Sequence, residues 1–234
     1  MSGPVWAIVV AAGRGVRFGA LKQFASIGER TVVGLAVQSV AATADGIVLV
    51  VPPDFSSLGL QDLGVRDPAG HRLQLATGGP TRAGSVRAGL AVVPADCEIV
   101  VVHDAARPLA SPQLCEAVVA AVRAGADGAI PGVPIHDTVK RVSEGVVIET
   151  IDRSHLVRVQ TPQAFSAQLL RRAHEGDPDA TDDAGLIEQA GGRVVVVPGE
   201  EANVKITSPD DLQVVAWWAE RHAKVQPAAP GGWA

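Results

Sequence analysis

Short apolar segments rich in valine and isoleucine recur along the chain and alternate with segments of helical periodicity. Within each apolar segment the hydrophobic residues are nearly continuous, which is typical of strands covered on both faces of a parallel sheet. This alternation predicts an α/β fold with a single doubly wound, mostly parallel sheet, which binds its ligands at the carboxyl ends of the strands. The expected strands are residues 5–10, 46–51, 72–77, 98–103, 128–133, 193–197 and 202–206, and the clearest helices are 31–42, 82–92 and 112–124.

Residues 137–152 depart from this rhythm. Apolar and polar residues alternate there around Ser143, Glu144 and Gly145, which predicts an antiparallel hairpin with a short glycine-containing loop. The hairpin is either an ordinary edge hairpin or an arm that protrudes from the sheet with one face in solvent. We expect one domain over residues 1–224 and, because residues 225–234 are rich in proline and glycine, a disordered C-terminal tail.

Composition narrows the class of protein. The 234 residues are enough for one large α/β domain with its own core, and the net charge of −5 argues against a nucleic-acid-binding surface. No apolar run approaches the ~20 residues that cross a bilayer, and no basic segment precedes the first apolar run, so we expect neither a membrane partner nor a secretory signal. Cys97 and Cys115 lack metal-ligand spacing, which favours a reduced cytoplasmic protein.

A glycine-rich loop follows the first expected strand, in the sequence VVAAGRGVRFGALKQF at residues 9–24. Gly13, Gly15 and Gly19 form a pattern one residue longer than the dinucleotide fingerprint, and the acidic residue that this fingerprint requires about 20 positions later is absent. Lys22 is followed by glutamine, whereas a P-loop lysine is followed by serine or threonine. The loop therefore fits neither a bound dinucleotide nor a kinase-type phosphate site.

Arg14, Arg17 and Lys22 add three cations to this loop in an otherwise acidic protein. Exposed backbone amides together with fixed cations suit a ligand that carries several phosphate charges. The alternative is a glycine-rich turn with solvated basic side chains. A second glycine turn, at Gly78 and Gly79, would let the main chain approach a flat base.

Polar residues also follow the expected strand at residues 98–103. Asp104 could orient a ribose or hold a metal and Arg107 could face an anion, or Asp104 could cap a turn and pair with Arg107. Lys205 lies among apolar residues, where a cation is costly unless it meets an anion. Arg153 and Thr161 belong to another polar cluster, at residues 152–165.

Helix-start signals account for other polar residues. Ser111 followed by Pro112 predicts an N-cap and a first helical position. Thr181 is an expected N-cap, with Asp182 and Asp183 in the first turn of the next helix. The alternative for these two carboxylates is a paired metal site.

Covalent catalysis has little support in the sequence. The histidines lack the spacing of a zinc hydrolase, no G-x-S-x-G turn is present, and neither cysteine has a glycine-rich context. Cations, hydroxyls and carboxylates at strand ends favour transfer chemistry on phosphates.

Seven blocks, in order between Val5 and Leu212, resemble the 2-C-methyl-D-erythritol 4-phosphate cytidylyltransferase family of the non-mevalonate isoprenoid pathway. They are AAGRGVRFGALKQF, GGPTRAGSV, VVHDAARP, DTVKRV, DRSHLVRVQTPQAF, TDDAGLIE and NVKITSPDDL. HDAARP, QTPQAF and NVKIT are the most specific parts. The resemblance implies a Rossmann-like nucleotidyltransferase fold with a protruding hairpin arm. It also implies transfer of CMP from CTP to methylerythritol phosphate, with release of pyrophosphate.

The resemblance also implies the site residues and the partners. The hairpin arm would form a homodimer, with Arg153 acting in the partner's site. The implied catalytic residues are Arg17, Lys22, Arg153 and Lys205. The implied nucleotide-binding residues are Ala11, Ala12, Gly13, Arg14, Gly15, Gly78, Gly79, Ser85, Asp104 and Ala105. The implied substrate-binding residues are Arg107, Thr138, Arg153, Thr161, Thr181 and Lys205.

The reaction needs no general base, because a phosphate monoester has a second pKa near 6 and is mostly dianionic at neutral pH. Arg, Lys and Mg²⁺ would offset the repulsion between two polyanions. Two departures from the family pattern stand out: the interval from Arg17 to Lys22 is short, with Leu21 in place of the usual proline, and Pro80 replaces a common acidic residue. Alternative functions are a cytidylyltransferase for another polyol phosphate, such as ribitol 5-phosphate, and a non-catalytic nucleotide-binding regulator.

Overall fold

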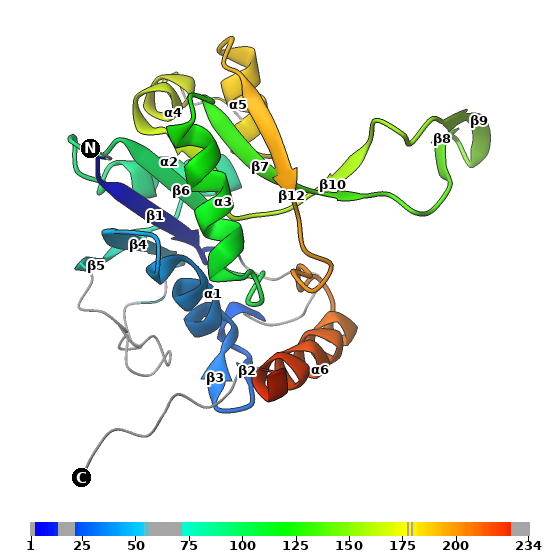
Figure 1. Cartoon of the computed structure of the whole chain (residues 1–234), viewed down its shortest axis with the longest axis horizontal. Helices are drawn as coiled ribbons and strands as arrows, with labels where there is room; N and C mark the ends of the chain where they lie inside the picture. Colours follow the sequence, from blue (N-terminus) through cyan, green and yellow to red (C-terminus); the bar gives the residue numbers. More distant parts are fainter. Residues whose placement is uncertain are drawn as a thin grey trace.

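The computed structural model describes residues 3–13, 22–53, 55, 72–176, 178 and 180–225. In this part of the chain the central sheet has eight strands, in the order β10-β7-β11-β6-β1-β4-β5, and β12 also pairs with β7 (Figure 1). The strands are β1 (Val5–Val10), β4 (Gly46–Val51), β5 (Arg72–Thr77), β6 (Ile99–Asp104), β7 (Gly128–Pro134), β10 (Val157–Val159), β11 (Gln163–Ser166) and β12 (Val194–Pro198).

Most strand pairs are parallel, as the apolar pattern predicts. β1 runs parallel to β4 on one side and to β6 on the other, and the pairs β4–β5 and β7–β12 are parallel too. The short strands β10 and β11 run antiparallel to their neighbours. The strand order reverses at β1, because β4 and β5 lie on one side of it and β6 lies on the other. The carboxyl ends of β1 and β6 therefore form a topological switch point, where ligands of such sheets bind. Val10 and Asp104, the last residues of these two strands, are direct partners.

Two helical layers cover the sheet because successive residues of its strands point to opposite faces. Val5, Ala7 and Val9 of β1 pack with α1 (Val32–Ala41) and α3 (Pro112–Arg123). Trp6 and Ile8 pack on the other face with α2 (Arg82–Leu90), α4 (Ala167–Ala173) and α5 (Asp183–Gln189). Each fully buried valine, leucine or isoleucine contributes about 1.5–3 kcal/mol. These two apolar layers hold the strand ends in place.

The helix starts follow local capping rules. Thr31, Thr81 and Ser111 are the N-caps of α1, α2 and α3, and each side chain accepts a hydrogen bond from a backbone N–H in the first turn. Pro112 occupies the first turn of α3, as expected. For α5 the prediction is wrong by one residue: Asp182, and not Thr181, caps the helix by accepting a hydrogen bond from Gly185 N at 3.0 Å.

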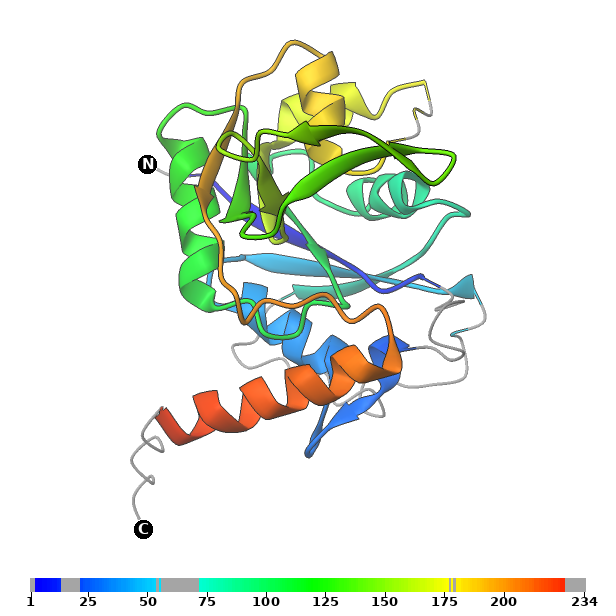
Figure 2. The ribbon, with the colours of Figure 1, turned by 90° about the vertical axis from the view of Figure 1, so that its right-hand side faces the viewer.

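The strand expected at residues 202–206 is absent from the described structure. This segment leads from β12 to α6 (Pro209–Val225), and Figure 2 shows it in orange. Its apolar side chains are explained by another contact: Ile206 is fully buried in a cluster with Ile27, Val32 and Val215 of α6. The remaining short elements are η1 (Lys22–Phe24), β2 (Ser26–Ile27) and β3 (Arg30–Thr31).

The expected hairpin is present and projects away from the sheet (Figure 1). It consists of β8 (Val139–Ser143) and β9 (Val146–Ile151), which in the described structure pair only with each other. Glu144 and Gly145 form the connecting loop with φ of 50° and 80°, the left-handed conformation that a two-residue hairpin turn requires. We call β8, β9 and this loop the arm.

Val225, the first residue of the expected tail, is the last residue of α6, and residues 226–234 lie outside the described residues. Among the described helices, none combines the length and the apolar character needed to span a membrane.

Candidate active site

A cleft of about 770 Å³ lies at the switch point, beside the carboxyl ends of β1, β5 and β6. Its volume is in the range of small-molecule sites. Ten of the residues implied by the family resemblance line it: Ala11, Ala12, Gly13, Lys22, Gly78, Gly79, Ser85, Asp104, Ala105 and Lys205. Arg14, Gly15 and Arg17, which were expected in the same site, lie outside the described residues.

The first part of the glycine loop is held by a side chain that the sequence analysis gave no role. Gln23 is buried, and its amide nitrogen donates to Ala11 O at 2.8 Å and to Gly13 O at 3.0 Å. Ala11 N donates to Val50 O at 2.8 Å. These contacts fix the main chain directly after β1. The available signal in the sequence was the position of Gln23 directly after Lys22, an expected anion-binding residue.

The second glycine turn needs its glycines because of close backbone approach. A Cβ at Gly78 would lie 2.2 Å from Ala12 Cβ, and one at Gly79 would lie 2.9 Å from the backbone of Gly84. Ser85 is buried, and its hydroxyl donates to Thr81 O at 3.0 Å. The turn is therefore packed against both the first loop and the start of α2.

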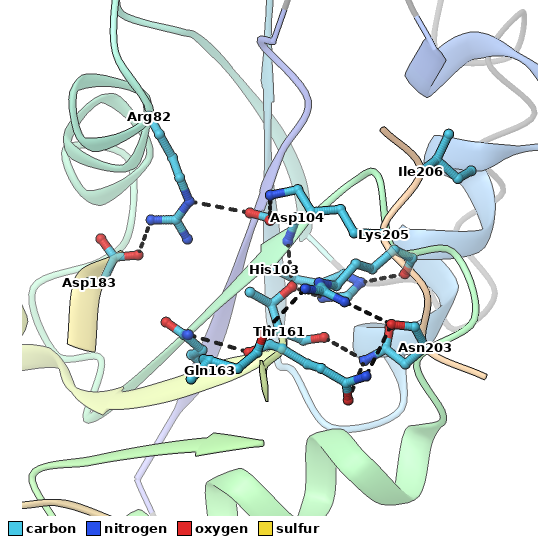
Figure 3. A network of polar contacts seen from close by, with 12 residues as sticks. Arg82, His103, Asp104, Thr161, Gln163, Asp183, Asn203, Lys205 and Ile206 are labelled. Atoms are coloured by element: carbon cyan, nitrogen blue, oxygen red, sulfur yellow. Dashed lines mark hydrogen bonds and ion pairs between the residues drawn. The ribbon is translucent and has the colours of Figure 1, made fainter. Parts of the chain in front are cut away.

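Asp104 lies between two cations that come from distant segments (Figure 3). Lys205 Nζ donates to Oδ2 at 2.6 Å, and Arg82 Nε donates to Oδ1 at 3.3 Å. Burial alone would raise the pKa of Asp104, but Arg82 and Lys205 hold it well below its usual range, so the carboxylate is ionised. Asp104 is thus the anion that the sequence analysis required for Lys205.

Arg82 is a cleft residue that the sequence analysis missed. It is the first residue of α2, where the helix dipole disfavours a cation. Its position therefore indicates a carboxylate partner, and the structure supplies two, Asp104 and Asp183. Burial would lower the pKa of Arg82, but these carboxylates raise it.

Lys22 reaches the same region from η1. Its Nζ donates to Ile206 O at 2.5 Å, next in sequence to Lys205. Two lysines that are far apart in sequence therefore border one cleft, each fixed in part by the segment that joins β12 to α6. A pair of lysines beside glycine turns suits the phosphates of a nucleotide.

His103 lies behind Asp104 and is fully buried, which lowers its pKa to about 4. The ring is therefore neutral at pH 7. Nε2 faces Arg107 O at 3.1 Å, and because a carbonyl only accepts, Nε2 carries the proton. Nδ1 then accepts from the Thr161 hydroxyl at 3.1 Å, while Thr161 Oγ1 accepts from Asp104 N at 3.0 Å. This chain of hydrogen bonds orients the end of β6.

Arg107 also supports the cleft from behind. Its guanidinium donates to Asn203 O at 2.7 Å and to Val159 O at 3.3 Å. Pairing with Asp104 was one of the two alternatives for Arg107; in the described structure its guanidinium makes these backbone contacts instead. Neither Arg107 nor Thr161 is among the described residues that line the cleft.

Three other expected residues also lie away from the cleft. Thr138 and Arg153 are exposed at the base of the arm, where Arg153 donates to His136 O. Thr181 is exposed just before the N-cap of α5. Within the described residues, no group of three or more His, Cys, Asp or Glu side chains is placed to hold a metal ion.

The cysteines have no place in the cleft. Cys97 and Cys115 are free and buried, and burial raises the pKa of both thiols, that of Cys115 to about 12. A thiol with such a pKa is not an effective nucleophile at neutral pH.

A switch-point cleft bordered by two glycine turns and two lysines is typical of α/β enzymes that act on nucleotides. The chain belongs to the 2-C-methyl-D-erythritol 4-phosphate cytidylyltransferase family, which it matches over residues 5–220. The protein of that name from Nocardia farcinica is 43% identical over 94% of this chain and 96% of its own length. The one from Rhodococcus opacus is 45% identical over 90% and 92%.

A solved structure agrees with this assignment. The 4-diphosphocytidyl-2C-methyl-D-erythritol synthase of Anaerococcus prevotii matches with a TM-score of 0.80 at 29% identity, over 94% of this chain and 99% of that one. The family resemblance and the fold class expected from the sequence are thereby confirmed.

Proposed function

We propose that this protein transfers the cytidylyl group of CTP to 2-C-methyl-D-erythritol 4-phosphate and releases pyrophosphate, as a step in isoprenoid precursor biosynthesis. The observation that carries the proposal is the cleft itself, in which Lys22 and Lys205 border the same switch point as the two glycine turns. The names of the relatives support the choice of substrates.

In this proposal the main chain of Ala11 to Gly13 and the ammonium of Lys22 hold the triphosphate of CTP. The turn at Gly78 and Gly79 packs against the cytosine. Asp104 and Lys205 lie toward the ribose and the acceptor. The loop residues Arg14, Gly15 and Arg17 are proposed to complete the triphosphate site.

The acceptor's phosphate oxygen attacks the α-phosphorus of CTP. A new P–O bond forms, and the bond between the α- and β-phosphates breaks, so that pyrophosphate leaves with the bonding electrons. No side chain needs to remove a proton, because the acceptor phosphate is already mostly dianionic. The lysines instead stabilise the charge on the phosphates in the transition state. His103, which is neutral and buried behind Asp104, positions that carboxylate and transfers no proton.

We also propose a divalent cation, Mg²⁺, as the cofactor. Mg²⁺ is commonly bound through one or two carboxylates together with substrate phosphates. Among the described residues that line the cleft, Asp104 is the only carboxylate, and it would be the protein's ligand. When bound, the cation would neutralise phosphate charge. The remaining ligands would come from CTP and water.

The arm supports a proposed homodimer. Val142, Val146, Val147 and Ile148 are each more than half exposed on it. Exposed apolar residues grouped in this way mark interaction sites. Arg153 and Thr138 at the base of the arm do not line this chain's cleft, which fits a role in the partner's site. Thr161, Arg107 and Thr181 are retained as proposed substrate-side residues. A reducing, cytoplasmic location is also retained as a proposal, because both thiols are free.

An acceptor panel tests the substrate. Purified protein would be incubated with CTP, Mg²⁺ and either methylerythritol phosphate or ribitol 5-phosphate, and pyrophosphate release would be measured. We expect turnover with methylerythritol phosphate. Equal or faster turnover with ribitol 5-phosphate would overturn the choice of substrate. Binding of CTP in calorimetry without pyrophosphate release from either acceptor would instead indicate a regulator.

A further inference from the structure

A line of polar contacts extends from the cleft into the protein through Arg82, and Figure 3 shows Asp104, Arg82 and Asp183 of this line. The guanidinium of Arg82 contacts Asp104 through Nε and donates from NH1 to Asp183 Oδ2 at 2.8 Å. The other oxygen of Asp183 lies 2.9 Å from His174 Nε2. The four residues belong to α2, β6, the first turn of α5 and the C-cap of α4.

Asp183 and His174 have no contact with the cleft that would explain them as ligand-binding residues. The side chains of Asp183 and His174 are only 1% and 3% exposed, and neither lines the cleft. Burial alone would raise the pKa of Asp183, but the contacts with His174 and Arg82 lower it, so the carboxylate is ionised. Capping does not explain its burial, because Asp182 is the N-cap.

The consequence of this contact lies at Arg82. That guanidinium is bound between two carboxylates, and Asp104 is in turn bound between Arg82 and Lys205. Two cations and two carboxylates therefore balance. Arg82 is partly exposed and lines the cleft. Without Asp183 its only carboxylate partner would be Asp104, which it shares with Lys205, so the excess positive charge would face an incoming triphosphate. Arg82 would also fix Asp104 less firmly, and Lys205, which is bound to Asp104, would in turn be less well positioned.

We propose that Asp183 is a positioning residue of the cleft. Fixed by His174, it holds Arg82 against Asp104 and neutralises the guanidinium, so that the substrate phosphates bind to Lys22 and Lys205 and not to Arg82. This inference rests on the proposed function. It assigns to Arg82 the support of Asp104, and to Asp183 the task of keeping Arg82 from binding the nucleotide in an unproductive place.

If Asp183 has this role, removing its charge should strengthen CTP binding and at the same time lower turnover. Asp183→Asn keeps the shape of the side chain and removes its charge. We expect CTP to bind about 3- to 10-fold more tightly, because a cation near the triphosphate loses its counter-charge in a medium of reduced dielectric constant. We expect kcat to fall about 10-fold or more, because binding gained in the ground state alone does not lower the barrier. A role limited to folding would lower thermal stability without tightening CTP binding.

The experiment measures the Kd of CTP by calorimetry, kcat with methylerythritol phosphate, and Tm. The variants are Asp183→Asn, Arg82→Gln and the double variant. If Arg82 carries the effect, the double variant loses the tighter CTP binding, which a double-mutant cycle detects. Glu188→Gln, which removes the same charge from an exposed position of α5, is the matched control. Weaker CTP binding in Asp183→Asn, or tighter binding that persists in the double variant, would overturn the inference.

His174→Leu keeps the proposal testable if Asp183→Asn does not fold. It leaves the charge of Asp183 but removes one of its two partners. We expect a fall in kcat of about 5-fold with the Kd of CTP unchanged within about 2-fold, since the carboxylate of Asp183 stays beside Arg82. An unchanged kcat, or a parallel loss of binding and turnover, would contradict the proposal. Wild-type protein that neither binds CTP nor releases pyrophosphate would refute the proposed function and this inference with it, whereas an active wild type with unchanged variants refutes only the inference.

Discussion

The cleft and the arm differ in how their residues are held. In the cleft, side chains from β6, α2, η1 and the segment before α6 are fixed by partly buried hydrogen bonds and ion pairs. In the arm, two strands pair only with each other within the described structure, and most of their side chains are exposed. A single chain is enough to organise the cleft, whereas the arm presents apolar side chains whose burial requires another molecule. Under the proposed function, the nucleotide half of the site would form in each subunit, and the acceptor half would be completed on dimerisation.

The largest expected effect tests the cleft. Lys22→Ala should lower kcat by ~10²–10³-fold, because removing one group that stabilises transition-state charge commonly has an effect of this size. Pyrophosphate release under saturating CTP measures it. Arg172→Ala, which removes an exposed cation from α4, is the control and should leave the rate unchanged. The same loss is expected for Arg17→Ala. Near-normal rates in both variants would contradict the proposal that these cations stabilise the transition state in the cleft.

The second effect tests the arm. Val147→Asp replaces an apolar side chain by a charged one at a position that is 56% exposed, so the fold of one chain should tolerate it. If the arm is a dimer contact, the dimer Kd should rise by on the order of 10²-fold, since a buried unpaired charge at an interface is costly. Analytical ultracentrifugation measures the dimer, and circular dichroism checks the fold. A dimer of unchanged affinity would place the interface elsewhere.

The third, smaller effect tests the cleft and the arm together. Neither Arg153→Ala nor Lys22→Ala dimers should be active, but mixed dimers would contain one site in which both residues are present. Statistical exchange of subunits then predicts recovery of about a quarter of wild-type activity. Native mass spectrometry confirms that exchange took place. Exchange without recovered activity would show that Arg153 acts within its own chain.

The smallest effect at neutral pH concerns His103, which lies behind Asp104. The pKa of His103 is lowered to about 4 in the folded protein, against about 6.5 in an unfolded chain. The unfolded state therefore takes up this proton first as the pH falls. The stability that neutral His103 contributes is complete above pH ~6.5 and is lost progressively down to pH ~4, by up to about 3 kcal/mol.

Urea unfolding at several pH values measures this dependence. In His103→Gln the free energy of unfolding should vary less between pH 6.5 and 4 than in the wild type, whatever its absolute value. Equal slopes would contradict the neutral, buried state of His103. Asp104 and Asp183 titrate at lower pH, because their pKa values are lowered in the folded state, and their contributions are lost only as the pH falls below about 4.

Much of the cleft could be predicted from the sequence because its parts are local. The residues that follow β1, β5 and β6 can be assigned to one edge of the sheet from strand periodicity alone, since parallel strands end together. Lys205 could be paired with an unknown anion, but the partner could not be identified. Asp104 lies 101 residues away in sequence, and the contact forms only when the segment before α6 crosses the strand ends.

The strand wrongly predicted at residues 202–206 and the missed contact between Arg82 and Asp183 have the same origin, because both depend on contacts between distant segments. Residues 202–206 have the apolar composition of a strand, yet Ile206 is buried by α6 and not by a neighbouring strand. Hydrophobic periodicity reports that a side chain is buried and not which element buries it. Asp183 had a local explanation as a residue in the first turn of a helix, and Arg82 lay at the start of the expected helix 82–92, so no local pattern identified their contact.

The sequence by itself determined most of the parallel strands and the helices between them, the two glycine turns, the hairpin and the family, because these depend on residue patterns that are close together along the chain. The tertiary structure alone decided which charges meet. Lys205 with Asp104, Asp104 with Arg82, and Arg82 with Asp183 are contacts between elements that the two apolar layers bring together. The energy of each such contact depends on burial and on distances of a few ångströms, and both are set only when the whole sheet is packed.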